Sequence, residues 1–553
     1  MALKIPIKLD IENFTIEDNI LKGIIVETEE NPNIGEAILN TLDSTPDHVA
    51  QIDAETDLKT TFAEMKDRSI RCALWMKEYG VKLGDIITIC SYNHLDTYVP
   101  IFATFYLGAT FNGWDHEVGL QAARHLMKLF EPKLIFVCES AIEVLLEAAK
   151  LENVKTEMIV FGNYRNINSL DDILKVQYSA KIRMFHPMRI ENRDAISIIL
   201  LTSGSTGAPK GVMHSYKNFL KLVQAFTVYP LKGVALCTST VYWLTGIMYM
   251  FVSTFTKGTR ITLKKWDVDE GCKAIQKYKV ERMFMSPVII NYLRKLKAFN
   301  KYDLRSLENI CTGGVKISQE ILKDFQEQLP NAFIYQAYGS TETGRMVATQ
   351  TEKIENLDSV GFVTSNTKIK IIDVDNHQIL GQNQEGEICV KQPTLMLGYY
   401  KNPEETRNAI DEDGWLHTGD KGYFDHNGEI IVTDRLKNII KCRNYQISPA
   451  ELEEILSSHP AVLEVAVVPI PHEMDTEQPL AFVSVNAHVS KEELISLTLV
   501  LGENKKLRGG VEFVQELPKT PSGKINRAAL KEMAKVLYNK RQLYATSEGV
   551  QLK

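Results

Sequence analysis

The sequence lacks the residues that several common classes of protein need. Its 553 residues include eight cysteines, but no C-x-x-C pair and no histidine cluster at metal-ligand spacing. A structural zinc site is therefore not expected, and free thiols in a reducing compartment are the simpler interpretation. The formal net charge of −7 gives no basic excess, so we expect no nucleic acid as a partner and attribute the charge to solubility.

Long apolar runs are scarce as well. The N-terminal MALKIPIKLDIENF has no continuous apolar segment of the signal-peptide type, so secretion is not expected. One long uncharged segment, Gly233–Thr256, carries seven Ser or Thr and two Gly, which favours a strand and a buried helix over a transmembrane segment. The C-terminal GVQLK differs from a Ser-Lys-Leu peroxisomal signal, and the expected location is intracellular, either cytoplasmic or peroxisomal.

Two common nucleotide-binding motifs are also absent. No hydroxyl residue adjoins Lys210, the only Gly-Lys pair, Gly523-Lys524, is followed by isoleucine, and G-x-G-x-x-G does not occur. Yet LLTSGSTGAPKGV (Leu200–Val212) contains seven Gly, Ser or Thr and one lysine directly after an apolar run. Exposed backbone N–H groups and one cation favour a phosphate-binding loop, although composition alone is also typical of a flexible surface linker.

The chain is long enough for two or more domains, and its apolar runs predict an α/β fold. Near-continuous apolar segments alternate with helical-looking ones, which is typical of mostly parallel sheets covered by helices on both faces. These segments are DIITIC (85–90), KLIFVC (133–138), MIVFG (158–162), AISIILL (195–201) and ERMFMS (281–286).

The pattern of apolar and polar residues changes from about residue 365. KIKIIDVD, GEICVKQ and GYFDHNGEIIVTDR predict antiparallel strands, the last one a hairpin around Asn427-Gly428. Ser448-Pro449-Ala450-Glu451 offers an N-cap, a proline at N1 and a capping-box glutamate, so a helix should begin there. We expect a large N-terminal domain over 1–434 with a β-rich subdomain, and a small, mobile α+β C-terminal domain over 435–553.

Five motifs in this order resemble those of the adenylate-forming superfamily, which includes acyl- and aryl-CoA ligases, insect luciferases and peptide-synthetase adenylation domains. The motifs are LLTSGSTGAPKGV (200–212), YGSTETG (338–344), GWLHTGD (414–420), DRLKNIIKCRNYQISPAELE (434–453) and PKTPSGKINR (518–527). They lie between residues 200 and 527 of the 553. The resemblance implies ATP, Mg²⁺ and CoA as cofactor and co-substrates, and a small-molecule carboxylic acid as substrate.

In this family a carboxylate attacks the α-phosphorus of ATP, so the site must supply positive charge. By resemblance, the β- and γ-phosphates would be surrounded by Ser203, Gly204, Ser205, Thr206, Gly207 and Lys210. Thr341 and Glu342 would contact the α-phosphate and hold Mg²⁺, which prefers carboxylate and phosphate oxygens. An exposed threonine and glutamate on a turn is the alternative.

The remaining nucleotide contacts are also implied by the resemblance. An ionised Asp420 only accepts hydrogen bonds, which suits two ribose hydroxyls, and Arg435 would assist it. Tyr338 would pack on the adenine and the glycine pair 313–314 would allow a close approach of backbone, although a core tyrosine and turn glycines are the simpler alternative. The residues assigned to the nucleotide beyond the phosphate loop are Gly314, Gln336, Ala337, Tyr338, Gly339, Thr341, Asp420 and Arg435.

Three lysines of the C-terminal part receive roles from the same resemblance. Lys524 would neutralise the acid carboxylate and the α-phosphate during adenylation, where a solvated loop lysine is the alternative. The small domain would then rotate about a hinge at Lys437. Lys441 would face the active site in the second, thiol-dependent step.

Some positions depart from the family pattern and bear on the substrate. Ser215-Tyr216 replaces a Thr-His pair, and Asn444 replaces a glycine of the thiolation loop. Tyr242 and Trp243 stand where many ligases and beetle luciferases have histidine near the acyl pocket. We assign these two residues and Gly313 to the substrate pocket, with a core anchor as the alternative role of Trp243.

Three functions remain open at this stage. The first is an ATP-dependent acid–CoA ligase acting on a fatty or arylpropenoic acid. The second is a luciferase-like monooxygenase, because KKLRGGV (505–511) also resembles insect luciferases and their non-luminous relatives. The third is a non-catalytic acyl- or nucleotide-binding protein. A peptide-synthetase module is disfavoured, because no carrier-protein segment follows residue 540, and the oligomeric state stays open.

Overall fold

The structure is a computed structural model. It describes residues 14–27, 33–176, 179–203, 209–226, 233–314, 317, 319–351, 354, 356, 358–442, 445–472, 475–501, 505–520 and 524–547. Backbone contacts divide the chain into two compact units. Unit 1 comprises Met1–Lys370, Cys389–His417 and His426–Ile430, and unit 2 comprises Ile371–Ile388, Thr418–Asp425 and Ile431–Lys553.

A seven-stranded, mostly parallel sheet forms one half of unit 1. Its order is β21-β10-β9-β6-β5-β7-β8, with parallel pairing from β9 to β8 and antiparallel pairing of β10 with β9 and β21. The predicted apolar runs form four of its strands. The bounds are β5 Ile86–Cys90, β6 Thr110–Trp114, β7 Leu134–Val137, β8 Glu157–Val160, β9 Ile196–Ser203, β10 Pro209–Ser215 and β21 Gly398–Tyr399.

A nine-stranded sheet forms the other half, in the order β17-β16-β15-β14-β13-β11-β12-β3-β4. Its central strands, from β3 to β15, pair in parallel. The bounds are β3 Val49–Asp53, β4 Lys59–Thr61, β11 Val234–Cys237, β12 Thr259–Thr262, β13 Arg282–Phe284, β14 Asn309–Gly313, β15 Phe333–Gly339, β16 Met346–Thr349 and β17 Phe362–Val363.

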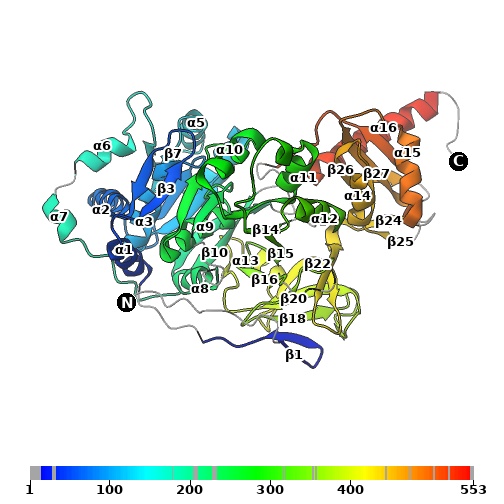
Figure 1. Cartoon of the computed structure of the whole chain (residues 1–553), viewed down its shortest axis with the longest axis horizontal. Coiled ribbons are helices and arrows are strands. Elements are labelled where there is room, and N and C mark those ends of the chain that lie inside the picture. Colours follow the sequence, from blue (N-terminus) through cyan, green and yellow to red (C-terminus); the bar gives the residue numbers. More distant parts are fainter. Residues whose placement is uncertain are drawn as a thin grey trace. The chain divides into compact units, whose positions relative to one another are not determined.

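Helices cover both sheets because the apolar strands need two buried faces. Helices α1, α2, α3, α8 and α9 share a hydrophobic core with β5, β6, β7 and β9, whereas α4 and α5 pack with the other face of those strands (Figure 1). Helices α10, α11 and α12 pack on the nine-stranded sheet. Their bounds are α1 Ile34–Ser44, α2 Phe62–Glu78, α3 Tyr98–Tyr106, α4 Leu120–Phe130, α5 Ile142–Leu151, α8 Tyr216–Phe226, α9 Leu244–Thr256, α10 Val268–Tyr278, α11 Pro287–Lys295 and α12 Gln319–Gln328.

Short elements complete unit 1. They are α6 Leu170–Lys175, α7 Ser179–Arg183, α13 Pro403–Ala409, and the 3-10 helices η1 Leu95–Thr97 and η2 Ala298–Asn300. The uncharged segment Gly233–Thr256 forms strand β11 and buried helix α9, as predicted. Among the residues that the structure describes, no helix combines the length and the apolar character needed to cross a membrane.

A further sheet has the order β1-β2-β18-β20-β22-β23, with β19 beside β18, and the boundaries between the two units fall within its later strands. The predicted hairpin is confirmed, since β22 and β23 are neighbours and Gly428 has a φ of 77°. The bounds are β1 Phe14–Glu17, β2 Ile20–Gly23, β18 Lys368–Ile372, β19 Ile379–Leu380, β20 Gly386–Lys391, β22 Leu416–Phe424 and β23 Ile430–Arg435.

A small α+β structure makes up the rest of unit 2. Its sheet has the order β25-β24-β27-β26, and β28 pairs with β27. The strands are β24 Ile440–Cys442, β25 Tyr445–Ile447, β26 Val462–His472, β27 Thr476–Val485 and β28 Gly510–Phe513. The helices are α14 Pro449–Ser458, α15 Lys491–Leu497 and α16 Arg527–Ser547, with η3 Leu436–Asn438 and η4 Thr498–Leu501. The α/β class with a large N-terminal and a small C-terminal part is thereby confirmed.

Two of the three features predicted for the start of α14 are confirmed, namely the N-cap serine and the proline at N1. Ser448 is the N-cap and accepts a hydrogen bond from the Glu451 N–H, and a proline occupies N1. The capping-box prediction for Glu451 is wrong, because its carboxylate accepts a hydrogen bond from Lys505 Nζ at 2.7 Å. Ser448 Oγ instead donates to the Asp434 carboxylate, so a strand residue secures the helix start.

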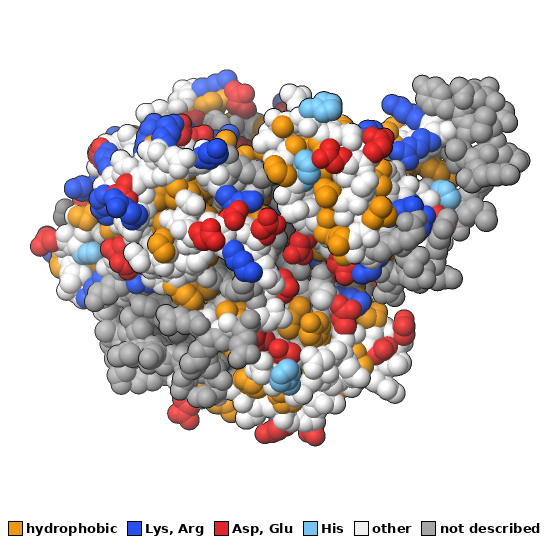
Figure 2. All heavy atoms as spheres, turned by 45° about the vertical axis from the view of Figure 1, so that its right-hand side comes forward, with side chains coloured by type: hydrophobic (Ala, Val, Ile, Leu, Met, Phe, Trp, Pro, Cys, Tyr) orange, Lys and Arg blue, Asp and Glu red, His pale blue; other side chains and the backbone are white. Residues whose placement is uncertain are grey.

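The cysteines agree with a reducing environment. All eight are free, and all but the partly buried Cys311 are buried. On the face that Figure 2 shows, basic and acidic side chains of the described residues are interspersed. This distribution fits the interpretation of the net charge as a matter of solubility.

Candidate active site

The turn after β15 carries Thr341 and Glu342, which the sequence assigned to the α-phosphate and Mg²⁺. The turn is fixed by two reciprocal bonds: the Ser340 N–H donates to Thr343 Oγ1 at 2.9 Å, and the Thr343 N–H donates to Ser340 Oγ at 3.3 Å. Gly344 closes it with a φ of 76°, a conformation that favours glycine. Thr341 and Glu342 are therefore held on a rigid turn at the carboxyl end of a central strand.

A buried histidine supports this turn from the neighbouring sheet. His214 lies in β10, is fully buried, and its Nε2 lies 2.8 Å from the Thr341 carbonyl oxygen. Because a carbonyl only accepts hydrogen bonds, Nε2 carries the proton and donates it. Burial lowers the pKa of His214 to about 4, so the ring is neutral at physiological pH.

Tyr399 joins the phosphate-loop lysine to the turn. Strand β21 pairs with β10 so that Tyr399 lies opposite Val212, which puts Lys210 diagonally across on the same face of the sheet. Lys210 Nζ lies 5.2 Å from the centre of the Tyr399 ring, and the Tyr399 hydroxyl donates to Glu342 Oε1 at 3.1 Å. One tyrosine thus contacts the cation of one motif and the carboxylate of another.

Lys210 has a carboxylate partner in this structure. Its Nζ lies 2.5 Å from Glu405 Oε2, and the two side chains are 14% and 34% exposed. Glu405 lies in the first turn of α13, where a negative charge is favoured by the helix dipole. A phosphate that binds Lys210 would therefore compete with Glu405 for the same ammonium group.

Glu342 has the chemistry to hold a divalent cation. Its Oε1 accepts the Tyr399 hydroxyl, its backbone carbonyl accepts the Met396 N–H, and within the described residues no ion pair or hydrogen bond involves Oε2. A half-buried carboxylate with one oxygen available suits a hard cation that shares phosphate oxygens.

The strand residues assigned to the nucleotide lie around the end of β15. Gln336 is buried, and its backbone N–H donates to the Gln350 side chain at 2.8 Å. Ala337 pairs with Gly313 of β14, where an added Cβ would lie 2.4 Å from the Ala337 carbonyl oxygen. Gly313 is thus required by the close approach of two strands. Gly314 follows with a φ of 83°, and Tyr338 and Gly339 end β15.

Tyr242 and Trp243 directly precede helix α9, and Trp243 is its N-cap residue. Their rings contact edge to face with centroids 4.6 Å apart, and both pack on the hydrophobic core that contains Trp114. Burial raises the pKa of Tyr242, so its phenol is neutral. Neither residue lines the cavity found beside this segment, which Val241 and Gly246 border, and their role in an acid pocket stays a prediction.

Asp420 and Arg435, assigned to the ribose, lie together in unit 2. They occupy neighbouring strands β22 and β23, and Arg435 Nε lies 2.8 Å from Asp420 Oδ1. The Asp420 side chain is 7% exposed, whereas that of Arg435 is 50% exposed. The Asp420 N–H donates to Thr418 Oγ1 at 3.1 Å, and the Gly419 N–H donates to the Glu387 carboxylate at 3.0 Å. The backbone at Asp420 is therefore fixed by side-chain acceptors, and its carboxylate is paired with Arg435.

The three lysines with roles in the C-terminal part stay predictions. Lys524 is exposed, and its carbonyl accepts the Thr520 N–H at 2.7 Å, which closes the loop before α16. Lys437 is exposed in η3, and Lys441 lies in β24. Gly204, Ser205, Thr206, Gly207 and Asn444, and the side chains of Ser203 and Lys441, lie outside the described residues.

Three residues of this site were missed by the sequence analysis. They are His214, Tyr399 and Glu405, which contact Thr341, Glu342 and Lys210. None of the three belongs to one of the five motifs that carry the family resemblance. A histidine or tyrosine in an apolar strand is also more often a core residue than a site residue. Their partners come from elements distant in sequence: the turn after β15 for His214 and Tyr399, and β10 for Glu405.

Known proteins are similar to this chain over most of its length. A family model described as AMP-binding enzyme matches residues 39–400, and one described as AMP-binding enzyme C-terminal domain matches residues 451–524. The chain is 31% identical to luciferin 4-monooxygenase of Nipponoluciola cruciata over 88% of this chain and 91% of that protein. It is 30% identical to 4-coumarate--CoA ligase-like 2 of Arabidopsis thaliana, with 87% of each chain covered.

A solved structure is also similar to this chain. The luciferase-like enzyme from the nonluminescent mealworm Zophobas morio matches with a TM-score of 0.71 and 29% identity, covering 76% of this chain and all of that one. The chain belongs to the AMP-binding, adenylate-forming enzyme family. Within it, the luciferases and the 4-coumarate–CoA ligase-like proteins are among its relatives.

Proposed function

We propose that this protein is an ATP-dependent, AMP-forming acid–CoA ligase. It activates a fatty or arylpropenoic acid as an acyl-adenylate with release of pyrophosphate, and then transfers the acyl group to CoA. Mg²⁺ accompanies the ATP. The 4-coumarate–CoA ligase-like relatives support this class of reaction.

One observation carries the proposal. The Tyr399 ring lies beside the Lys210 ammonium while its hydroxyl bonds to Glu342. Tyr399 thus holds a cation close to a carboxylate that has an available oxygen. This pair is suited to bind polyphosphate oxygens and their metal ion.

Each of the site residues has a separate role in the proposed adenylation. Lys210 stabilises the departing pyrophosphate once a phosphate oxygen replaces Glu405. Thr341 holds the α-phosphate through a hydroxyl on a turn fixed by His214, and Glu342 would hold Mg²⁺, which neutralises phosphate charge when bound. Asp420 accepts the ribose hydroxyls. Lys524 neutralises the acid carboxylate as it approaches the α-phosphorus.

A luciferase-like monooxygenase is the second candidate, because luciferin 4-monooxygenases are relatives over nearly the whole chain. Its first half-reaction is the same adenylation, so the phosphate site does not separate the two. The segment before α9 does not separate them either, because Tyr242 and Trp243 pack as an aromatic pair where many ligases and beetle luciferases alike have histidine. A non-catalytic binding protein is disfavoured, since Lys524, Glu342 and Asp420 are all present.

Pyrophosphate release over a panel of acids tests the proposal. The panel contains fatty acids of increasing length and arylpropenoic acids, each with and without CoA, and photons are counted in parallel with candidate luciferins. We expect acid-dependent pyrophosphate release, and a thioester product only when CoA is present. Light above background would favour the second candidate, and nucleotide binding without pyrophosphate release would favour the third.

A further inference from the structure

Lys210 of the phosphate loop is paired with a carboxylate that lies outside the five motifs. Its Nζ lies 2.5 Å from Glu405 Oε2, and the two side chains are 14% and 34% exposed. An ion pair that is partly shielded from water attracts more strongly than a fully exposed one, because less solvent screens the two charges. Any anion that binds Lys210 therefore has to break this pair.

The segment that carries Glu405 is fastened next to Lys210 by hydrogen bonds of its backbone. The Tyr400 N–H donates to the Gly211 carbonyl at 2.7 Å, one residue after the lysine. The Glu405 N–H donates to the Asn402 side chain at 3.2 Å, which fixes the first turn of α13. Because these bonds do not involve the ion pair, Glu405 stays within reach of Lys210 after the pair is broken.

The position of Glu405 gives it an effect on every polyphosphate that binds Lys210. A carboxylate beside the ammonium competes with the phosphate oxygen for the cation and also repels the anion, so both effects lower the affinity. In the proposed reaction ATP is held through its ribose and α-phosphate as well, whereas pyrophosphate has lost both contacts once the α–β bond is cleaved. Release of pyrophosphate is therefore the step that gains from a competing carboxylate.

We propose that Glu405 is an internal competitor for Lys210, which weakens the hold of the site on pyrophosphate and speeds its release. The carboxylate yields the ammonium to a phosphate oxygen when ATP binds, and it re-forms the ion pair as pyrophosphate leaves. Only the partner of the lysine is exchanged, and no covalent bond forms or breaks. The inference rests on the proposed function for the identity of the anion, and on the Lys210–Glu405 geometry for the competition.

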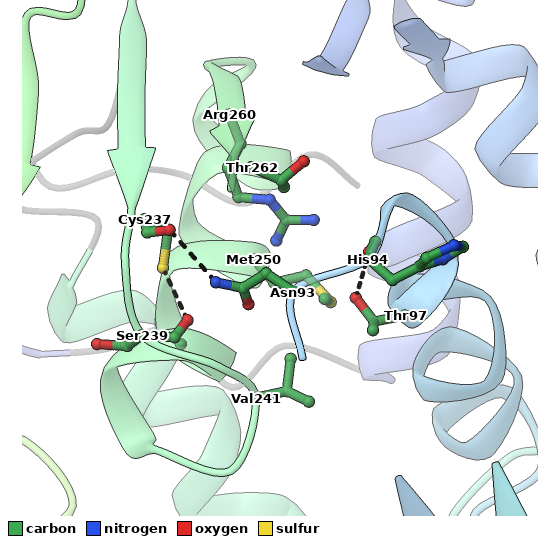
Figure 3. A pocket seen from close by; sticks show the side chains of 10 residues that line it. Asn93, His94, Thr97, Cys237, Ser239, Val241, Met250, Arg260 and Thr262 are labelled. Carbon is green, nitrogen blue, oxygen red and sulfur yellow. Dashed lines mark hydrogen bonds between the residues drawn. The ribbon is translucent and has the colours of Figure 1, made fainter. Parts of the chain in front are cut away.

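A second polyphosphate site would complicate a binding test, and the small cavity of unit 1 does not provide one. It is lined by Arg260, a buried arginine, together with residues that include Asn93 and Met250 (Figure 3). Its volume of about 10 Å³ is room for about one water-sized group, which is too small for pyrophosphate. Pyrophosphate binding should therefore report on the Lys210 site.

Isothermal titration calorimetry with magnesium pyrophosphate tests the competition on the full chain. We expect Glu405→Gln to lower the Kd about three-fold or more, because it removes the competing charge and keeps the shape of the side chain. Glu404→Gln is the matched control and should leave the Kd unchanged, because Glu404 is exposed in the same first turn of α13 and its loss removes the same charge from that helix end. An unchanged or higher Kd for Glu405→Gln would overturn the proposal, since a structural or magnesium-binding role of Glu405 predicts that result.

Steady-state kinetics give a second readout. In Glu405→Gln, the inhibition constant for pyrophosphate and the KM for MgATP should both fall, while the KM for the acid stays at the wild-type value. A chain that releases no pyrophosphate with any acid would refute the proposed function, whereas the calorimetric comparison would still decide the role of Glu405. Melting temperatures check folding; if Glu405→Gln does not fold, Glu405→Asp, which is one methylene shorter, should show a smaller decrease in Kd.

Discussion

At the scale of single residues, the candidate phosphate site depends on contacts that aim and hold charged groups. Tyr399 orients Glu342, His214 holds the Thr341 carbonyl, and Arg435 lies against Asp420. Each contact is a hydrogen bond or ion pair of a partly or fully buried group, where loss of a partner has a measurable cost. Each can be removed by a substitution that keeps most of the side chain's shape.

Tyr399→Phe removes the hydroxyl bond to Glu342 and keeps the ring beside Lys210. We expect the KM for MgATP to rise about five-fold, since one such bond contributes about 1 kcal/mol, with little change in the KM for the acid. Steady-state kinetics over MgATP and acid concentrations measure both. Tyr400→Phe is the matched control, because the Tyr400 ring stacks on Phe130 instead. An equal effect of the two substitutions would contradict the role of Tyr399.

His214 predicts a pH dependence of stability. Its pKa is about 4 in the folded chain and 6.5 without the fold, so between these values only the unfolded chain binds the proton. The free energy of unfolding should therefore fall as the pH drops from 6.5 to 4, by about 3 kcal/mol from this group. His214→Gln, whose amide can still donate to Thr341, should lose less stability over this range.

Melting temperatures between pH 4.5 and 7 measure the effect of His214. His125→Gln is the control, because His125 is an exposed histidine elsewhere in unit 1. We expect the wild type and His125→Gln to show the same slope with pH, and His214→Gln a shallower one. Three equal slopes would mean that His214 is not held neutral by burial.

Asp420→Ala tests the ribose assignment. Two hydrogen bonds to a buried carboxylate contribute about 3 kcal/mol, so the KM for ATP should rise on the order of 100-fold while that for the acid changes little. Arg435 is half exposed, so its charge stays solvated when its partner is lost. Asp413→Ala, at an exposed turn, should change neither constant. Equal effects on both substrates would remove Asp420 from the ribose site.

At the scale of elements, the start of α9 packs on the hydrophobic core and is also the segment that the sequence assigns to the acid pocket. The segment from β11 to α9 borders a small cavity through Val241 and packs Tyr242 and Trp243 against the hydrophobic core. Side chains that begin a helix are fixed by its first turn, and the Ile247 N–H bonds to the Trp243 carbonyl at 3.1 Å. A substitution here changes either the acid pocket or the packing of two sheets.

Trp243→Ala distinguishes these roles. If Trp243 shapes the acid pocket, the ratio of kcat/KM for a long acid to that for a short acid should rise, while the KM for ATP stays near the wild-type value. If it is a core anchor, stability should fall by about 3 to 5 kcal/mol and activity should drop for every acid alike. The two measurements are the specificity ratio and the melting temperature. An unchanged ratio with a large fall in melting temperature would contradict the pocket assignment.

At the scale of the whole molecule, the residues assigned to one reaction belong to two units. Lys210, Thr341 and Glu342 lie in unit 1, and Asp420 and Lys524 lie in unit 2. The resemblance to adenylate-forming enzymes implies that the C-terminal part changes position between two half-reactions. Substitution of a lysine that acts in only one half-reaction should then impair only that half-reaction.

Lys524→Ala should abolish formation of the acyl-adenylate and spare transfer from preformed acyl-adenylate to CoA. A lysine that neutralises two converging anions matters only while they converge, which is an effect of about 100-fold or more on the first step. Pyrophosphate exchange measures the first half-reaction and thioester formation the second. Lys519→Ala is the control, because Lys519 lies in the same loop and pairs with Glu464 at 3.0 Å. A parallel loss of both half-reactions would show that Lys524 has another role.

The sequence by itself determined the local structure and the kind of chemistry. Apolar runs between helical segments predicted the strands, Asn427-Gly428 the hairpin, and Ser448 the start of a helix, because these depend on neighbours along the chain. The capping-box prediction for Glu451 was wrong, since a distant lysine competes for its carboxylate. The motifs also predicted the family, because the charges and turns that phosphate chemistry needs stand close together in sequence.

Only the tertiary structure decided which side chains meet. Lys210, Glu342 and Tyr399 are more than 50 residues apart from one another. The pairing of β10 with β21 brings Lys210 to Tyr399, and the turn after β15 brings Glu342 to the Tyr399 hydroxyl. Arg260 and Gln51 come together only because β12 pairs with β3. Nothing in the local sequence of Arg260 separates it from a surface arginine. Burial and strand register are properties of the packed sheets, and they alone decide that Arg260 lies in the interior beside Gln51.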